Sequence, residues 1–175
     1  MPQPELQVSQ WFNTQQDITL KSLRGKVVVL EAFQMLCPGC VRHGIPLAQR
    51  VDAAFPKDKV AVLGLHTVFE HHAAMTPVSL KAFLHEYRIT FPVGVDAAGS
   101  GDMPKTMQAF NMRGTPSLLL FDKSGALRAH HFAEVSELLL GAEIATLLNQ
   151  EVEAPPAPSP EPEASSCDTG SCKAT

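Results

Sequence analysis

Residues 26–40 read KVVVLEAFQMLCPGC, and this stretch governs the interpretation of the whole chain. Lys26–Phe33 is a nearly continuous apolar run rich in β-branched residues, which is typical of a strand covered on both faces. Cys37 and Cys40 follow it closely, and residues 38–55 predict a helix interrupted near Gly44 and Pro46. The two cysteines are therefore expected where a buried strand ends and a helix begins.

Strand and helix patterns alternate along the rest of the first 150 residues. Further strands are expected at 60–66, 91–96, 117–121 and 127–132, and further helices from Pro77, at 104–110 and at 135–149. Asp122–Gly125 has the composition of a hairpin turn between the last two strands. This order predicts an α/β fold, a three-layer sandwich in which a mixed central sheet carries helices on both faces.

The chain has 175 residues and a formal net charge of −4, which is unevenly distributed. Residues 151–175 contain four glutamates, one aspartate and one lysine, so they carry the whole −4 and residues 1–150 are neutral. A neutral domain lacks the basic surface that gathers phosphates, and we expect no nucleic acid among its partners. No apolar run reaches about 18 residues, so no membrane-spanning segment is expected. Residues 1–17 lack the features of an export signal, which predicts a cytoplasmic location if Met1 is the native start.

The composition divides the chain into a domain, residues 1–150, and a tail, residues 151–175. Residues 151–166 contain five prolines and four glutamates, so we expect an extended linker with too little apolar surface to fold. The tail ends in a second cysteine pair, Cys167 and Cys172. Eighteen steps separate Asn149 from Cys167, and such a linker spans roughly 23 Å as a coil and up to about 56 Å as polyproline. The tail pair is therefore interpreted as an auxiliary redox pair that reaches Cys37, and two exposed thiols that oxidise adventitiously are the alternative.

The spacing of Cys37 and Cys40 suits reversible disulfide chemistry. Two cysteines three positions apart at a helix start can close a disulfide with little backbone rearrangement, and the unpaired N–H groups there favour a thiolate. Cys37 is expected at the N-terminal end of the helix, whereas Cys40 is expected to point back into the first turn and to be more buried. A structural disulfide and half of a zinc site are the alternatives, and the zinc site would need two further ligands.

Two other features converge on this pair. Glu31 lies inside the apolar strand, where burial would raise its pKa and suit it to relay a proton for Cys40. The alternative is that Glu31 reaches an edge of the sheet or pairs with a lysine. Thr115–Pro116 precedes a strand, and a cis bond there would leave the Thr115 backbone free to pair with a substrate strand.

The stretches VVVLEAFQMLCPGC, VAVLGLHTVF, ITFPVGVD and MRGTPSLLLFDKSGALR resemble the TlpA-like (DipZ-like) branch of the thioredoxin superfamily. The resemblance covers about residues 20–149. It implies that Cys37 is the attacking thiol, that Cys40 is the resolving thiol, and that Thr115–Pro116 forms a cis bond facing them. Glu31 falls where thioredoxins keep a buried aspartate, in agreement with a proton relay.

The chain also departs from that family. Leu36 occupies the position before the first cysteine, where a tryptophan is usual, and Pro38–Gly39 reverses the Gly-Pro of reducing thioredoxins. Pro46 follows Cys40 by six residues, whereas five is more common in the family. Leu36 predicts a reshaped surface around the nucleophile, the position of Pro46 leaves the helix kink open, and the Pro-Gly dipeptide leaves the redox potential open.

These observations predict a thiol–disulfide oxidoreductase with antioxidant activity. Its expected partners are a disulfide-containing protein or a small-thiol substrate, and an external dithiol reductant or oxidant. No cofactor and no metal are expected. A thiol peroxidase is one alternative, although Gln34 stands where peroxiredoxins have a threonine. A non-enzymatic metal-binding module that uses Cys37, Cys40 and the tail thiols is the other.

Overall fold

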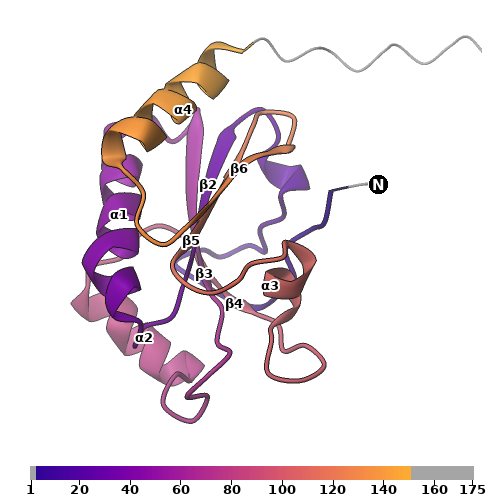
Figure 1. Ribbon diagram of the computed structural model, residues 1–175, viewed down its shortest axis with the longest axis vertical. Coiled ribbons are helices and arrows are strands. Elements are labelled where there is room, and N and C mark those ends of the chain that lie inside the picture. The colour runs from indigo at the N-terminus through magenta and orange to yellow at the C-terminus, as the bar shows by residue number, and fades with distance from the viewer. Residues whose placement is uncertain (1–2, 151–175) are drawn as a thin grey trace, which may run out of the picture.

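The computed structural model describes residues 3–150 and is shown in Figure 1. The predicted tail, residues 151–175 with Cys167 and Cys172, lies outside the described residues. The strands are β1 (Val8–Phe12), β2 (Val27–Phe33), β3 (Val60–His66), β4 (Val93–Asp96), β5 (Ser117–Phe121) and β6 (Leu127–Phe132). The α-helices are α1 (Ile45–Ala54), α2 (Pro77–Glu86), α3 (Lys105–Ala109) and α4 (Glu137–Asn149). A 3-10 helix, η1 (Lys21–Leu23), and a π-helix, η2 (Cys40–Gly44), complete the described elements.

The six strands form one mixed sheet in the order β1-β4-β3-β2-β5-β6. Strands β2, β3 and β4 run parallel, while β5, β6 and β1 pair antiparallel with their neighbours. Strand β2 lies between β3 and β5 and is buried along its whole length. The predicted α/β sandwich with a mixed sheet is confirmed.

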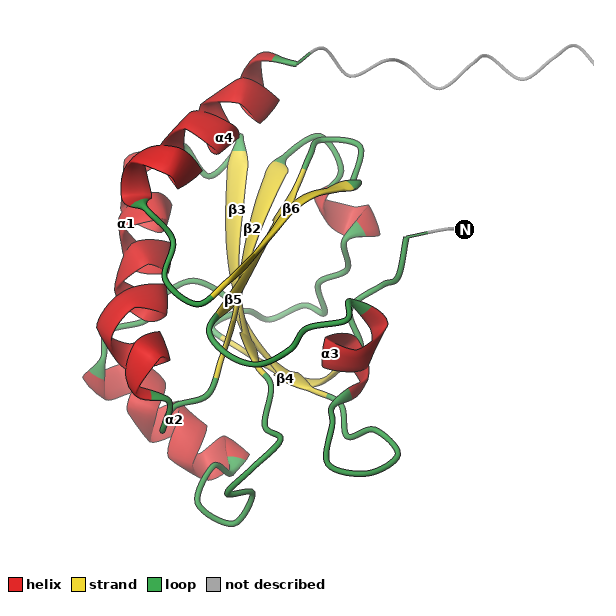
Figure 2. Cartoon of the chain, in the orientation of Figure 1, coloured by secondary structure: helices red, strands yellow, loops and turns green. Residues whose placement is uncertain are grey.

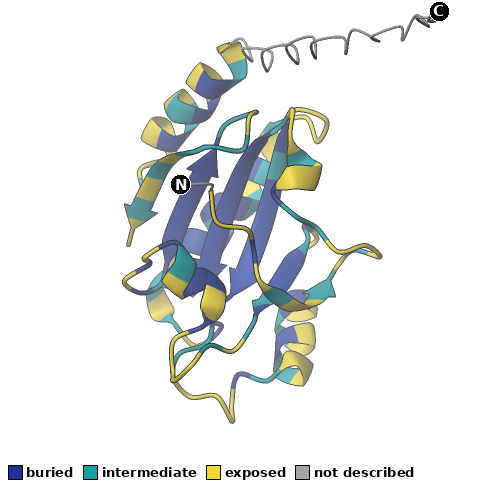
Figure 3. Cartoon of the chain, turned by 90° about the vertical axis from the view of Figure 1, so that its right-hand side faces the viewer, coloured by how far each residue is buried: buried dark blue, intermediate teal, exposed yellow. Residues whose placement is uncertain are grey.

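Helices cover the sheet on both sides, as Figure 2 shows, with α1, α2 and α4 on one face and α3 on the other. Successive residues of β2 alternate between two apolar cores, because side chains of a strand point to opposite faces. Val27, Val29 and Phe33 pack towards α1, α2 and α4, whereas Val28 and Leu30 pack towards α3. Figure 3 shows the resulting buried sheet with exposed outer helix surfaces. Glu31 lies on the same face of β2 as Val29 and Phe33, and it therefore faces α1.

Strand β1 was not among the predicted elements. Its burial is irregular, since only Trp11, Phe12 and Val8 are partly buried, so it lacks the strict alternation that marks a strand in the sequence. It forms an edge by pairing with β4, a contact that no local pattern shows. None of the helices between residues 3 and 150 combines the length and apolar character that a membrane crossing requires.

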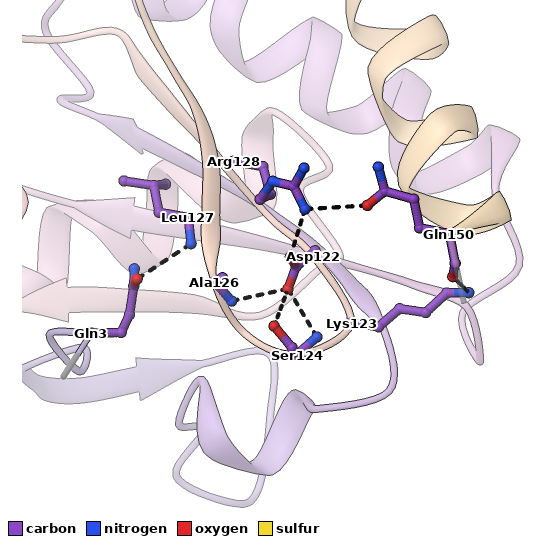
Figure 4. Close-up of polar contacts among 8 residues, drawn as sticks. All are labelled: Gln3, Asp122, Lys123, Ser124, Ala126, Leu127, Arg128 and Gln150. Carbon is purple, nitrogen blue, oxygen red and sulfur yellow. Dashed lines mark hydrogen bonds and ion pairs between the residues drawn. The ribbon is translucent and has the colours of Figure 1, made fainter. Parts of the chain in front are cut away.

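The predicted hairpin turn between β5 and β6 is confirmed and is drawn in Figure 4. The carboxylate of Asp122 accepts hydrogen bonds from the backbone N–H groups of Ser124 (2.9 Å) and Ala126 (3.0 Å) and from the guanidinium of Arg128 (3.0 Å). Gly125 takes a positive φ of 85°, which a residue without a side chain adopts at no steric cost. The turn thereby returns the chain to the antiparallel edge.

Candidate active site

Cys37 lies at the end of the loop that follows β2, where the helix begins. Its sulfur accepts a hydrogen bond from the backbone N–H of Cys40 at 3.3 Å and donates one to the carbonyl oxygen of Thr115 at 3.5 Å. The side chain is partly exposed, so a substrate can reach it. An N–H group directed at the sulfur stabilises a thiolate, which is the nucleophile of disulfide exchange.

Cys40 is the first residue of η2 and is completely buried. Both cysteines are free thiols in the structure. Burial, and next the hydrogen bond with Cys37, raise the pKa of Cys40 well above the usual range of a thiol. The two sulfurs therefore differ as the sequence predicts, with an accessible thiol in front of a buried one that needs a base to lose its proton.

Thr115–Pro116 is a cis peptide bond and lies against the cysteine motif. A Cβ atom placed on Gly39 would lie 3.2 Å from Cδ of Pro116 and 4.0 Å from the Cys37 sulfur. The glycine of the Cys37–Cys40 motif thus allows the proline ring to pack closely on the helix start. The structure brings Pro116 and Thr115 to the cysteines, as the sequence predicts.

Glu31 is buried in the middle of β2, with 2% of its surface exposed. Its Oε1 atom accepts no hydrogen bond from any residue between 3 and 150. Burial, and to a smaller extent the charge of Cys37, raise the pKa of Glu31 well above its usual value. The alternatives of an edge position or a lysine partner are wrong, because β2 is central and Glu31 forms no ion pair among the described residues.

Gln34 has a role that the sequence did not reveal. Its buried side chain accepts a hydrogen bond from the N–H of Phe69 (3.2 Å) and donates one to the carboxylate of Glu70 (3.3 Å). These bonds hold the loop after β3 next to Cys37, where a cavity of about 320 Å³ opens. The cavity is lined by residues of the motif, the loop and the cis bond, including Leu36, Cys37, Pro38, Phe69, Ala74 and Thr115.

Gly44 is a second residue that the sequence did not single out for the site. It ends η2, and a Cβ atom there would meet the carboxyl group of Glu31 and the ring of Pro116. The signal was present in the sequence as a glycine inside a helix and as the six-residue step from Cys40 to Pro46. To infer from this signal that Gly44 lies against Glu31, one must know which residue of β2 faces the helix.

Within the part of the chain that the structure describes, metal ligands do not gather near this site. Residues 3–150 contain no group of three or more His, Cys, Asp or Glu side chains placed to hold a metal ion. His66, at the end of β3, is buried and packs its ring against Phe33 at 5.4 Å between centroids. The tail cysteines, Cys167 and Cys172, lie outside the described residues, so their approach to Cys37 stays a prediction.

A family model and several curated proteins are similar to half or more of this chain. The model of the AhpC/TSA family matches residues 1–130. Protein DipZ of Mycobacterium tuberculosis is 30% identical over 134 residues, which are 75% of this chain and 18% of DipZ. NHL repeat-containing protein 2 of Homo sapiens is 31% identical over 94 residues, 52% of this chain and 12% of that protein. The chain thus spans less than a fifth of these curated relatives.

Two solved structures cover the domain much more completely. A crystal structure of a thioredoxin-like superfamily protein has 77% identity and a TM-score of 0.85, over 86% of this chain and 98% of that one. A thiol-disulfide isomerase from Corynebacterium glutamicum has 45% identity and a TM-score of 0.82, over 86% of this chain and 97% of that one. The chain therefore belongs to the AhpC/TSA family, within the TlpA-like branch of the thioredoxin-like thiol–disulfide oxidoreductases.

Proposed function

We propose that Cys37 and Cys40 together exchange electrons with disulfides of protein substrates. The thiolate of Cys37 attacks a substrate disulfide, forms a mixed disulfide and releases one substrate thiolate. Cys40 then attacks the Cys37 sulfur, which releases the second substrate thiolate and leaves a Cys37–Cys40 disulfide. An external dithiol restores the two thiols by the same exchange in reverse. The substrate is thereby reduced by two electrons and the external dithiol is oxidised by two.

The observation that carries this proposal is the asymmetry of the two sulfurs. Cys37 is partly exposed and accepts the Cys40 N–H at 3.3 Å, while Cys40 is buried behind it. An accessible thiolate can attack an incoming disulfide, and a buried thiol one helical turn away can attack only the sulfur of Cys37. The similarity to the thiol-disulfide isomerase of Corynebacterium glutamicum supports the same chemistry.

Glu31 serves as the proton acceptor for Cys40 in this proposal. Burial raises the pKa of Glu31, which makes its carboxylate a stronger proton acceptor, and Oε1 has no hydrogen-bond partner within residues 3–150. When Cys40 attacks, its proton passes to Glu31 and then to the departing substrate thiolate. A carboxyl group that were already fully hydrogen-bonded would accept the proton less readily.

The cavity beside Cys37 favours an apolar segment of a protein substrate. Leu36 is 55% exposed at its rim, and Phe69 and Ala74 add apolar surface from the loop that Gln34 holds. The carbonyl oxygen of Thr115 lies within reach of Cys37 and offers a backbone acceptor to an extended segment. We propose that substrates dock there as a strand next to Thr115.

Substitution of Cys37 by serine tests the function. We expect Cys37→Ser to abolish reduction of a protein disulfide in the presence of a dithiol reductant, and Cys40→Ser to accumulate mixed disulfides at Cys37. Efficient consumption of hydrogen peroxide with little disulfide exchange would instead indicate the peroxidase alternative. Retention of a stoichiometric metal through chelation, with no exchange, would indicate the metal-binding alternative.

The tail pair, Cys167 and Cys172, is proposed as an auxiliary dithiol that exchanges with Cys37. A Cys40→Ser variant should then trap an intramolecular disulfide between Cys37 and a tail cysteine, identified by peptide mapping under dilute conditions. Species that are only intermolecular would contradict this role. The cytoplasmic location and the antioxidant activity expected from the sequence stay predictions.

A further inference from the structure

The helix that follows Cys37 contains an irregular turn beside the reactive residues. In η2 (Cys40–Gly44), the N–H of Ile45 donates to the carbonyl oxygen of Cys40 five residues earlier, as in a π-helix. Such a turn accommodates one extra residue in an α-helix and often occurs at functional sites. Pro46 comes next and has no N–H to donate, so a regular ladder is interrupted there in any case. The irregular turn directs Gly44 towards the sheet, where it is buried.

Backbone conformation does not explain a glycine at this position. Gly44 has φ −61° and ψ −56°, which are ordinary helical values that any residue adopts. A glycine within a helix costs about 0.5–1 kcal/mol relative to alanine. Space explains it instead. A Cβ atom at Gly44 would overlap Oε1 of Glu31, and it would lie 2.9 Å from Cδ of Glu31 and 3.1 Å from Cβ of Pro116.

We infer that Gly44 is a positioning residue for the thiol–disulfide reaction, because its missing side chain leaves the recess that holds the carboxyl group of Glu31 between the helix and Pro116. This inference rests on the proposed function, in which Glu31 accepts the proton of Cys40. A methyl group at position 44 would have to displace the carboxyl group, since it would overlap Oε1 of Glu31 and also lie in close contact with the ring of Pro116.

The kinetic test uses Gly44→Ala in the full chain, with Gly141→Ala as the matched control. Gly141 is also a helical glycine, in α4, but a Cβ atom there meets nothing within 4 Å. The measured step is the attack of Cys40 on a glutathione mixed disulfide at Cys37, which releases glutathione and forms the Cys37–Cys40 disulfide. We expect Gly44→Ala to slow this release at least tenfold at pH 7 and to give it the pH profile of Glu31→Gln. Gly141→Ala should keep the wild-type rate.

Rescue by a shorter acid separates positioning from general damage to the fold. Glu31→Asp withdraws the carboxyl group by one methylene, so Gly44→Ala combined with Glu31→Asp should release glutathione faster than Gly44→Ala alone. A wild-type rate and pH profile in Gly44→Ala would overturn the inference.

A stability cycle tests the recess without using activity. Gly44→Ala should lower the melting temperature by several degrees in the wild-type background and by much less in Glu31→Ala, where the overlapping carboxyl group is gone. An equal loss in both backgrounds would overturn the inference. A Glu31→Ala variant that releases glutathione at the wild-type rate would instead overturn the proton transfer to Glu31, so the two failures are distinguishable.

Discussion

Glu31 and Asp96 are both buried acidic side chains of the sheet, but they differ in their hydrogen-bond partners. Asp96, at the end of β4, accepts hydrogen bonds from the backbone N–H groups of Thr106 (2.8 Å) and Met107 (3.0 Å) and from the hydroxyl of Thr67 (3.0 Å). Glu31, in the centre of β2, leaves Oε1 without a partner among residues 3–150. Burial raises the pKa of both carboxyl groups, but for Asp96 the hydrogen bonds oppose the rise.

The difference separates a structural acid from a reactive one. Asp96 satisfies the first N–H groups of α3 and so joins that helix to the sheet, far along the chain from the cysteines. Glu31 destabilises the fold, because a buried carboxyl oxygen with no hydrogen-bond partner among residues 3–150 leaves its desolvation cost uncompensated. A destabilising group that lies beside Pro116 and is influenced by the charge of Cys37 is better explained by the reaction than by stability.

The largest effect is expected from Glu31→Gln, which keeps the shape of the side chain and removes its charge. Resolution of a mixed disulfide by Cys40 should slow about 100-fold at pH 7, because the amide cannot accept a proton. Stopped-flow release of glutathione measures this rate. An unchanged rate would place Glu31 with Asp96 as a structural acid.

The same variant should alter the dependence of stability on pH. The pKa of Glu31 is raised in the folded state, so the wild-type protein loses stability as the pH rises from the unfolded value near 4.5 through the folded value. Glu31→Gln should lack this loss and unfold at higher denaturant concentration at pH 8. A wild-type protein with the same pH profile as the variant would contradict the assignment.

Asp96→Asn is the matched substitution at the structural acid. In contrast to Glu31→Gln, it should lower the stability of the fold and leave disulfide exchange unchanged. Each carboxylate oxygen of Asp96 accepts a hydrogen bond from a backbone N–H group, so the NH₂ group of asparagine must face one of these donors. The lost hydrogen bond costs about 2 kcal/mol of unfolding free energy. Disulfide exchange by the folded protein should be retained. Denaturant titration and the exchange assay on the same sample check both points. A loss of exchange without a loss of stability would contradict the structural role of Asp96.

The smallest effect concerns His66, a buried polar group that also lacks a partner at Nε2 among residues 3–150. Burial lowers its pKa to about 4, so the folded state favours the neutral ring. The contribution of the neutral His66 ring to the unfolding free energy should be fully present above the unfolded pKa of 6.5. It should be lost as the pH drops towards 4, by about 1 kcal/mol between pH 6 and pH 5. His66→Gln should reduce this fall, which denaturant titrations of both proteins at pH 6 and pH 5 measure, and an unchanged fall would contradict the assignment to His66.

Much of this molecule was predictable from local patterns. Strands β3, β5 and β6 agree with the predicted residues at both ends, and β2 begins one residue after the predicted Lys26, because buried strands leave a continuous apolar signal. The cysteine motif and the cis bond before β5 were also expected where they occur. Strand β1 was missed, since an edge strand paired through β4 needs little apolar surface of its own.

The pattern of residues 26–40 was enough to predict two cysteines where a buried strand gives way to a helix, and an acid inside that strand. Which groups surround that acid depends on how distant segments pack against one another. The packing of η2 on β2 places Gly44 against the carboxyl group of Glu31, while backbone donors of α3 and the Thr67 hydroxyl bind Asp96. The desolvation cost of a buried acid depends on neighbours from distant parts of the chain, and the spacing of residues along one segment does not specify those neighbours.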